Sequence, residues 1–233
     1  MQLKNKNVVI TGGSMGIGLK LAQKLIDEGS NVLVCARNRA GLEEAKRENL
    51  ALHVVQCDIT VKSEVENLLA ESERLLGSID ILINNAAVFR LFKIQDEYAI
   101  ENQLQEIDIN FGGTVMVTNV FLPALLKSEE PVVVNVTSGL GYIPVSSAPI
   151  YSASKAAINS WTWSLRHQLK DTAMHVVLLS PPVVDTRMNE NNPTSEGMKK
   201  ISTEKFAEIA INGLKNKKKE ILAKPINSLK FIS

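Results

Sequence analysis

The stretch "NVVITGGSMGIGLKLAQKLIDEG", residues 7–29, joins an apolar run to a glycine-rich loop and a segment with helical spacing. Residues 7–11 are apolar and rich in β-branched side chains, as in a buried strand. Residues 17–28 place apolar side chains three and four apart, and Gly29 follows where a helix C-cap glycine is expected. The stretch therefore predicts a strand, a tight turn and a helix, the repeating unit of α/β proteins.

The same alternation continues along the chain. The further apolar runs are continuous, as in parallel strands covered on both faces, and lie at 31–35, 52–57, 79–84, 131–137, 174–180 and 220–223. Segments with helical spacing separate them at 41–49, 62–77, about 99–126, about 150–170 and 203–215. With no Pro/Gly-rich linker and no internal repeat, this predicts one doubly wound α/β domain over residues 1–233, with a seven-stranded parallel sheet flanked by helices on both faces.

Composition excludes several classes of function. A chain of 233 residues can bury a large core without disulfides or metals, and a net charge of +1 gives no reason to expect nucleic acid or an anionic membrane as a partner. Cys35 and Cys57 are expected to be reduced, buried thiols, and no Cys/His cluster predicts a metal site. No run approaches the ~20 apolar residues of a membrane helix. We therefore expect a cytoplasmic protein acting on a small molecule.

The loop "TGGSMGIG" predicts a nucleotide site. Gly12, Gly16 and Gly18 would let the backbone approach a pyrophosphate, whose charge would be met by the helix N-terminus. Glycines alone are a weak signal, because any tight strand-to-helix turn recruits them. Their position after the first strand strengthens it. Leu19 follows Gly18 where a nucleoside-triphosphate loop would have lysine, which excludes that alternative.

The end of the second strand bears on which dinucleotide binds. A site that prefers NAD would place Asp or Glu there, whereas this chain has Ala36 followed by Arg37 and Arg39 in "VCARNR". Arginines match a 2′-phosphate in charge and bidentate geometry. We therefore expect NADP(H) to be favoured over NAD(H). The alternative is that both arginines are solvated loop residues.

The stretch "YSASK" sets Tyr151 and Lys155 four residues apart with small residues between them. On a helix these two side chains would share one face. Such a pair is commonly just a ring covered by an aliphatic stem, so its meaning depends on the rest of the chain.

Taken together, the motifs resemble those of the short-chain dehydrogenase/reductase family over nearly the whole chain. "TGGSMGIG" matches the TGxxxGxG cofactor loop of this Rossmann-type family, "CDIT" carries Asp58, and "NNAA" at 84–87 is similar to its NNAG segment. The resemblance implies that the cofactor is contacted by Gly12, Ser14, Met15, Gly16, Ile17, Gly18, Arg37, Asp58, Ile59, Asn85, Ala86, Ala87, Tyr151, Lys155, Pro181, Val184 and Thr186.

The order and spacing of Asn110, Ser138, Tyr151 and Lys155 also resemble the family's catalytic set. The resemblance implies that Tyr151 is the general acid/base, provided that its pKa falls from ~10 toward neutrality, and that Lys155 with an oxidised nicotinamide supplies that help. Ser138 would polarise the substrate oxygen. By the same analogy Lys155 would hold the nicotinamide ribose, and Asn110 a water that links Lys155 to solvent.

The chain departs from the family pattern in places. Ala87 and Pro182 replace common glycines, and Met15 stands where many NADP-using members have a basic residue, so a 2′-phosphate would depend more on Arg37. The polar segment 187–201 is expected to be a substrate lid. The chain stops soon after the seventh run, which we expect to leave fewer residues over the pocket.

These observations predict an NADP(H)-dependent oxidoreductase that interconverts a carbonyl and an alcohol. A non-catalytic dinucleotide-binding sensor or scaffold remains the alternative, although such a protein has no need of the Tyr–Lys pair. Family habit implies a homodimer or homotetramer built on the helices 99–126 and 150–170. "LRHQLKDT" and "SPPVVDT" are similar to bacterial members encoded beside teichoic-acid D-alanylation genes, a likeness that specifies no reaction.

Overall fold

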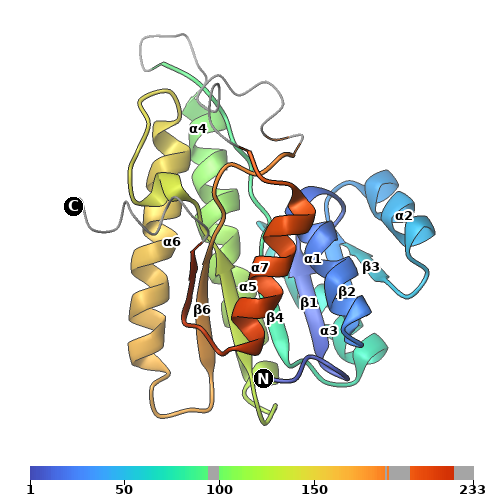
Figure 1. Ribbon diagram of the computed structural model, residues 1–233. Helices are drawn as coiled ribbons and strands as arrows, with labels where there is room; N and C mark the ends of the chain where they lie inside the picture. Colours follow the sequence, from blue (N-terminus) through green and yellow to red (C-terminus); the bar gives the residue numbers. More distant parts are fainter. Residues whose placement is uncertain (94–99, 187, 189–199, 223–233) are drawn as a thin grey trace.

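The computed structural model describes residues 1–93, 100–186, 188 and 200–222, and its centre is one parallel sheet (Figure 1). The strand order is β3-β2-β1-β4-β5-β6-β7, and each neighbouring pair is parallel. The strands are β1 (Asn7–Thr11), β2 (Asn31–Ala36), β3 (His53–Gln56), β4 (Ile81–Asn84), β5 (Val132–Val136), β6 (His175–Ser180) and β7 (Glu220–Leu222). This confirms the expected doubly wound α/β architecture.

Helices cover both faces of the sheet. The described helices are α1 (Gly16–Asp27), α2 (Arg39–Glu48), α3 (Lys62–Leu76), α4 (Ile100–Ile107), the π-helical η1 (Asp108–Gly113), α5 (Thr114–Leu125), the 3-10 turn η2 (Gly139–Gly141), α6 (Pro149–Gln168) and α7 (Thr203–Lys215). Helices α1, α2 and α7 pack on one face, and α3 and α5 with α6 pack on the other (Figure 1).

Alternate residues of each central strand enter two separate cores, as β1 illustrates. Val8 and Ile10 pack under α1 and α7, whereas Val9 packs under α3 and α5, and all three are fully buried. A strand covered on both faces has no polar side to present, which explains why its sequence is continuously apolar.

The chain reverses its direction of winding at β1. This strand pairs with β2 on one side and with β4 on the other. The loops after β1 and β4 therefore leave two neighbouring strands and run apart from each other. A crevice forms at such a switch point because the helices that follow the two strands lie on opposite faces.

The predicted helix at 99–126 is interrupted. The structure begins α4 at Ile100 and places a π-helical turn, η1, between α4 and α5. Gly113 lies in this turn, and a Cβ added there would be 2.6 Å from Ile59 Cδ1, so the backbone approaches the loop after β3 closely. The apolar spacing predicted helix but gave no sign of the extra residue in the turn. π-Turns of this kind often occur at functional sites.

The predicted lid falls largely outside the described residues, which exclude 187 and 189–199. At its two ends, Ile201 N–H donates to Val183 O at 3.0 Å and Asp185 N–H donates to Ile201 O at 2.9 Å. The two ends of the segment are therefore joined by backbone hydrogen bonds. Within the described residues, no helix has both the length and the apolar character needed to cross a membrane.

Candidate active site

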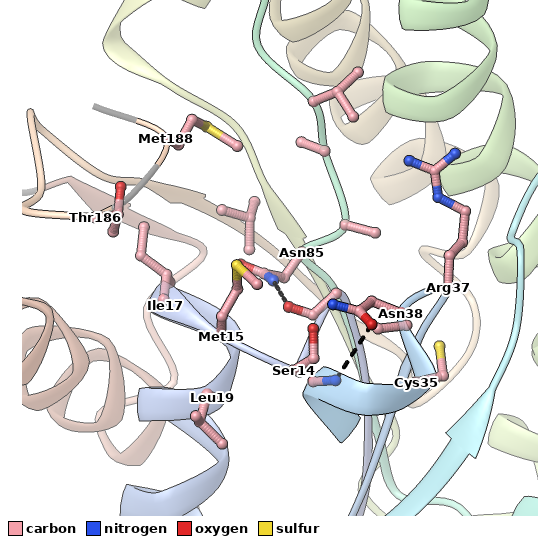
Figure 2. Close-up of a pocket in the computed structure, with 18 of the residues that line it drawn as sticks. Ser14, Met15, Ile17, Leu19, Cys35, Arg37, Asn38, Asn85, Thr186 and Met188 are labelled. Atoms are coloured by element: carbon pink, nitrogen blue, oxygen red, sulfur yellow. Dashed lines mark hydrogen bonds between the residues drawn. The ribbon is translucent and has the colours of Figure 1, made fainter. Parts of the chain in front are cut away.

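A cavity of about 750 Å³ lies at the carboxyl ends of the central strands. The loops after β1, β2, β3 and β4 line it together with α6 and the segment after β6. Figure 2 shows Ser14, Arg37, Asn85 and Thr186 from four of these segments. All predicted cofactor residues reach its wall except Gly18 and Val184. Fifteen of the seventeen predicted cofactor residues, which lie between Gly12 and Thr186 in the sequence, therefore line one cavity.

The glycine loop is packed too tightly for side chains. Gly12 has φ +66°, and a Cβ there would lie 2.7 Å from Ala86 Cα. A Cβ on Gly18 would lie 2.4 Å from Gly12 O, so Gly18 packs helix α1 against the loop rather than facing the cavity. Asn85 Nδ2 donates to Gly12 O and to Thr11 O, both at 3.0 Å, which ties the loop to the end of β4 (Figure 2).

The loop leads directly into the N-terminus of α1. Met15 is the N-cap residue and its side chain makes no capping hydrogen bond, and the first turn contains no acidic residue. The helix dipole at this end favours an anion. The absence of side chains at Gly12 and Gly18 and this helix terminus together fit the pyrophosphate of a dinucleotide.

Val184 is placed differently from the sequence prediction. Its side chain is 1% exposed and packs in the core beneath α1 and α7, and its backbone bridges to Ile201. Thr186, two residues later, lines the cavity instead.

The predicted pair of arginines is separated by the structure. Arg37 lines the cavity, and its Nη1 lies 3.8 Å from Asp58 Oδ2. Figure 2 shows its side chain extending away from Ser14 and Asn38. Arg39 instead begins α2 and donates from Nε to Glu43 Oε1 at 2.9 Å, away from the lining residues. The structure therefore places only Arg37 of the two predicted arginines at the cavity wall.

Several lining residues were not predicted. They occupy the same carboxyl edge of the sheet, or the first turns of the following helix, and include Cys35, Asn38, Glu44, Cys57, Thr137 and Met188. The two cysteines are buried and free, as expected. Interaction with the Cys57 side chain, together with burial, raises the pKa of Cys35. The position of these residues at strand ends could have predicted that they line the cavity, since the carboxyl ends of the strands converge on the crevice.

Helix α6 presents the predicted catalytic pair. Tyr151 and Lys155 are 8% and 2% exposed, and both line the cavity. Lys155 Nζ donates to Val136 O at 3.0 Å and lies 5.5 Å from the centroid of the Tyr151 ring. Ser138, just beyond β5, interacts with the Tyr151 side chain closely enough to lower its pKa. Tyr151 and Lys155 thus lie at the cavity wall, whereas Ser138 interacts with Tyr151 but is not among the residues that line the cavity.

The protein's own groups do not make Tyr151 acidic. Burial raises the pKa of Tyr151 to about 12, and the interaction with Ser138 opposes this only in part. Burial also lowers the pKa of Lys155 to about 8. Burial therefore dominates both pKa shifts in the protein without nucleotide. The expectation that Lys155 together with an oxidised nicotinamide lowers the pKa of Tyr151 stays a prediction.

Asn110 is engaged in a way that the sequence did not indicate. Its Oδ1 accepts from Val88 N–H at 2.8 Å, and its Nδ2 donates to Val88 O at 2.9 Å and to Ser154 Oγ at 3.1 Å. Both amide hydrogens of the fully buried side chain are thus used within the protein. In the structure Asn110 anchors the segment that follows β4, and the water-holding role stays a prediction.

Phe89 and Glu106 influence the surroundings of Tyr151 and Lys155. The Phe89 ring meets the Tyr151 ring edge-on, with centroids 4.9 Å apart and planes at 79°. Glu106 is fully buried and raises the pKa of both Tyr151 and Lys155 through its charge. Neither residue was predicted. The one available signal was that Glu106 lies one helical turn before Asn110.

A comparison with known sequences identifies the family. The family described as short chain dehydrogenase matches residues 6–197. This chain belongs to the short-chain dehydrogenase/reductase family. The match covers the glycine loop and the Asn110, Ser138, Tyr151 and Lys155 positions, so the resemblance inferred from the motifs is confirmed.

Relatives of this short-chain dehydrogenase/reductase are named as oxidoreductases. One is the "Uncharacterized oxidoreductase DltE" of Bacillus subtilis (strain 168), 36% identical over 99% of this chain and 92% of the relative. Another is "Uncharacterized oxidoreductase SAR2567" of Staphylococcus aureus (strain MRSA252), 32% identical over 96% of this chain and 99% of the relative. The similarity to DltE confirms the likeness to members encoded near teichoic-acid D-alanylation genes.

Solved structures share the fold. A short chain dehydrogenase/reductase from Burkholderia phymatum in complex with NAD has a TM-score of 0.89 at 22% identity, covering 99% of this chain and 93% of that one. A short chain dehydrogenase from Burkholderia cenocepacia J2315 in complex with NADP has a TM-score of 0.86 at 25% identity, with the same coverage.

Across the described part of the short-chain dehydrogenase/reductase, no group of three or more His, Cys, Asp or Glu residues could hold a metal.

Proposed function

We propose that this short-chain dehydrogenase/reductase is an NADP(H)-dependent oxidoreductase that interconverts a small-molecule carbonyl and its alcohol, with Tyr151 as the general acid/base. The observation that carries the proposal is that Tyr151 and Lys155 line the same cavity as the glycine loop, with Ser138 interacting with Tyr151. One cavity thus combines a dinucleotide-binding loop with a proton donor.

Three regions would hold the dinucleotide. The loop at Gly12 and the N-terminus of α1 would bind its pyrophosphate. Asp58 and Arg37 would flank the end that carries the 2′-phosphate, and Thr186 and Lys155 would flank the nicotinamide end. When bound, the nicotinamide would donate a hydride to the substrate carbonyl or accept one from the alcohol. We further propose that the whole chain, 1–233, acts as one such domain, in the cytoplasm and as a homo-oligomer.

The chain's own residues would manage the proton. Tyr151 Oη would give its proton to the substrate oxygen as negative charge develops there, and Ser138 would hydrogen-bond the same oxygen. A pKa of about 12 keeps Tyr151 protonated across neutral pH, so the proton is present, but it also makes Tyr151 a weaker acid than a free tyrosine. Accepting a proton in the alcohol-oxidising direction would need added positive charge nearby. The Lys155 ammonium, 5.5 Å from the Tyr151 ring centroid, is the nearest protein source.

The decisive test is Tyr151→Phe, with turnover measured against a panel of aldehydes and ketones using NADPH. Because loss of a positioned general acid costs about 10²- to 10⁴-fold, kcat should fall by that factor. The affinity for NADPH, followed by nucleotide fluorescence, should stay within about threefold, since the ring remains.

Tyr142→Phe is the matched control, because Tyr142 is half-buried, does not line the cavity, and has a buried hydroxyl with no hydrogen-bond partner among the described residues. It should leave turnover unchanged. If Tyr151→Phe retained turnover within a few-fold of the native protein, the catalytic role would be wrong. If the native protein turned over no member of the panel yet bound NADPH, a sensor or scaffold would be favoured.

A further inference from the structure

Glu106 is a buried carboxylate beside the active site. Its side chain is 0% exposed, and its Oε1 accepts from Arg90 N–H at 3.2 Å. Its Oε2 has no hydrogen-bond partner among the described residues. A buried carboxylate is costly to keep unless it is paired, so a group placed here calls for a role.

Glu106 and Asn110 lie one turn apart and hold the same short segment. Asn110 binds both the N–H and the carbonyl of Val88, and Glu106 binds the N–H of Arg90. The Arg90 guanidinium adds bonds back to α4, from Nη1 to Asn102 O at 2.5 Å and from Nη2 to Gln105 Oε1 at 2.6 Å. The segment 88–90 is therefore fixed at both ends.

Phe89 is the residue between these two attachment points. Its ring meets the Tyr151 ring edge-on at a centroid distance of 4.9 Å, an attractive geometry for an aromatic pair. A shift of the backbone at 88–90 would therefore move the ring that packs against Tyr151. Catalysis is sensitive to displacements of about 1 Å in reacting groups.

We propose that Glu106 is a positioning residue of this active site, which together with Asn110 fixes the segment 88–90 and so seats the Phe89 ring against Tyr151. The proposal deepens the proposed function and rests on it. Glu106 acts through Phe89 and through its charge, and it does not contact the reacting atoms.

The charge of Glu106 provides a readout that a purely structural role would not move. The charged or titratable groups that act on it are Arg90, from the segment after β4, and Tyr151 and Lys155, from α6. Burial raises the pKa of Glu106 to about 7, with Arg90 and Lys155 opposing. Its ionisation near neutral pH should therefore be felt at the Tyr151 ring.

Tyr151 can be observed directly in protein labelled with 3-fluorotyrosine. The chain has three tyrosines, and the ¹⁹F resonance of Tyr151 is the one lost in Tyr151→Phe. In the native protein this resonance should shift with pH with a midpoint near 7. In Glu106→Gln, which keeps the acceptor oxygen but cannot ionise, that step should vanish while the resonance stays sharp. In Glu106→Ala, which loses the acceptor too, it should move or broaden at every pH.

Glu101→Gln is the matched control, because Glu101 is an exposed carboxylate on the same helix. It should reproduce the native titration. Turnover of an aldehyde or ketone that the native protein reduces should fall about tenfold in kcat for Glu106→Ala, with the KM for NADPH unchanged, and Glu106→Gln should recover most of it.

A Tyr151 resonance that is the same in the native protein, Glu106→Gln and Glu106→Ala at all pH values would overturn the inference. This spectrum needs no turnover, so it can fail while Tyr151→Phe still abolishes activity. Conversely, an active Tyr151→Phe variant would overturn the proposed function while leaving the coupling of Glu106 to Tyr151 intact.

Discussion

The two ends of the cavity are built from different parts of the chain, backbone at one end and buried side chains at the other. The nucleotide end, at the loops after β1 and β2, relies on backbone: Gly12 and Gly18 have no room for a side chain, and the charged residue Arg37 is half-exposed. The proposed catalytic end relies on buried side chains, since Tyr151 and Lys155 are nearly inaccessible and their pKa values are strongly shifted.

This contrast teaches where electrostatics is strong in the molecule. Ions that remain in water are screened, so the 3.8 Å pair of Arg37 and Asp58 contributes little to stability. Groups removed from water interact at low dielectric, so each desolvated charge changes the pKa of its neighbours. We expect steric changes to dominate at the nucleotide end and charge changes to dominate at the catalytic end.

The largest effect should come from Gly12→Ala. The new Cβ would lie 2.7 Å from Ala86 Cα, a backbone atom, and alanine would be strained at φ +66°. The loop and the end of β4 must then move apart, so the affinity for NADPH should fall by about 100-fold or more. Nucleotide fluorescence titration measures this.

Gly112→Ala is the control, because a Cβ there has no neighbour within 4 Å. It should bind NADPH as the native protein does. If Gly12→Ala bound NADPH normally, the backbone character of the nucleotide end would be refuted.

A second prediction concerns stability and Glu106. Its pKa is raised from 4.5 to about 7 in the folded protein, so the folded state holds the proton more tightly than the unfolded chain. Stability is therefore lost as pH rises from 4.5 through 7, by about 3 kcal/mol if the full shift applies. Glu106→Gln removes this loss, and its thermal stability relative to the native protein should improve between pH 5 and pH 8.5.

Scanning calorimetry at the two pH values checks the result, with Glu101→Gln as the exposed counterpart. A difference between native protein and Glu106→Gln that does not change with pH would show that Glu106 is not titrating in the folded state. The properties of the proposed catalytic end would then depend less on the charge of Glu106 than we infer.

The smallest effect should come from Arg37→Ala. Because Arg37 lines the cavity but is half-exposed, its contact with a 2′-phosphate should be worth about tenfold in affinity for NADPH, with NADH binding changed by less than about twofold. Separate titrations with NADPH and NADH measure both values.

Arg39→Ala should change neither affinity, since Arg39 is paired with Glu43 outside the cavity wall. Native protein that bound NADH as tightly as NADPH would overturn the preference for NADP(H). The two titrations thus separate the arginine that faces the site from its neighbour two residues away.

The sequence was a good guide wherever one local rule governed the outcome. Each predicted strand lies within about two residues of an observed one, because a strand buried on both faces must be apolar throughout. Gly29 and Gly77 both follow helices at φ +83°, as the C-cap rule predicts. The spacing of Tyr151 and Lys155 likewise sufficed to place them on one face of α6.

The prediction was incomplete wherever the outcome depended on neighbours distant in the chain. The π-helical turn at η1, the attachment of Val88 to Asn110 and the contact of Phe89 with Tyr151 all join segments that only folding brings together. The effect of burial on the pKa of Tyr151 was not predicted for the same reason, since motif spacing carries no information about desolvation.

The sequence by itself therefore determined the order of strands and helices along the chain, the glycine loop and the placement of Tyr151 and Lys155 on one helix face, because these follow from periodicity and from short-range geometry. Only the tertiary structure decided how acidic those groups are and what holds them. Burial of Tyr151, Lys155 and Glu106 in one place sets their charges against one another, and the strength of that coupling depends on the water that packing excludes.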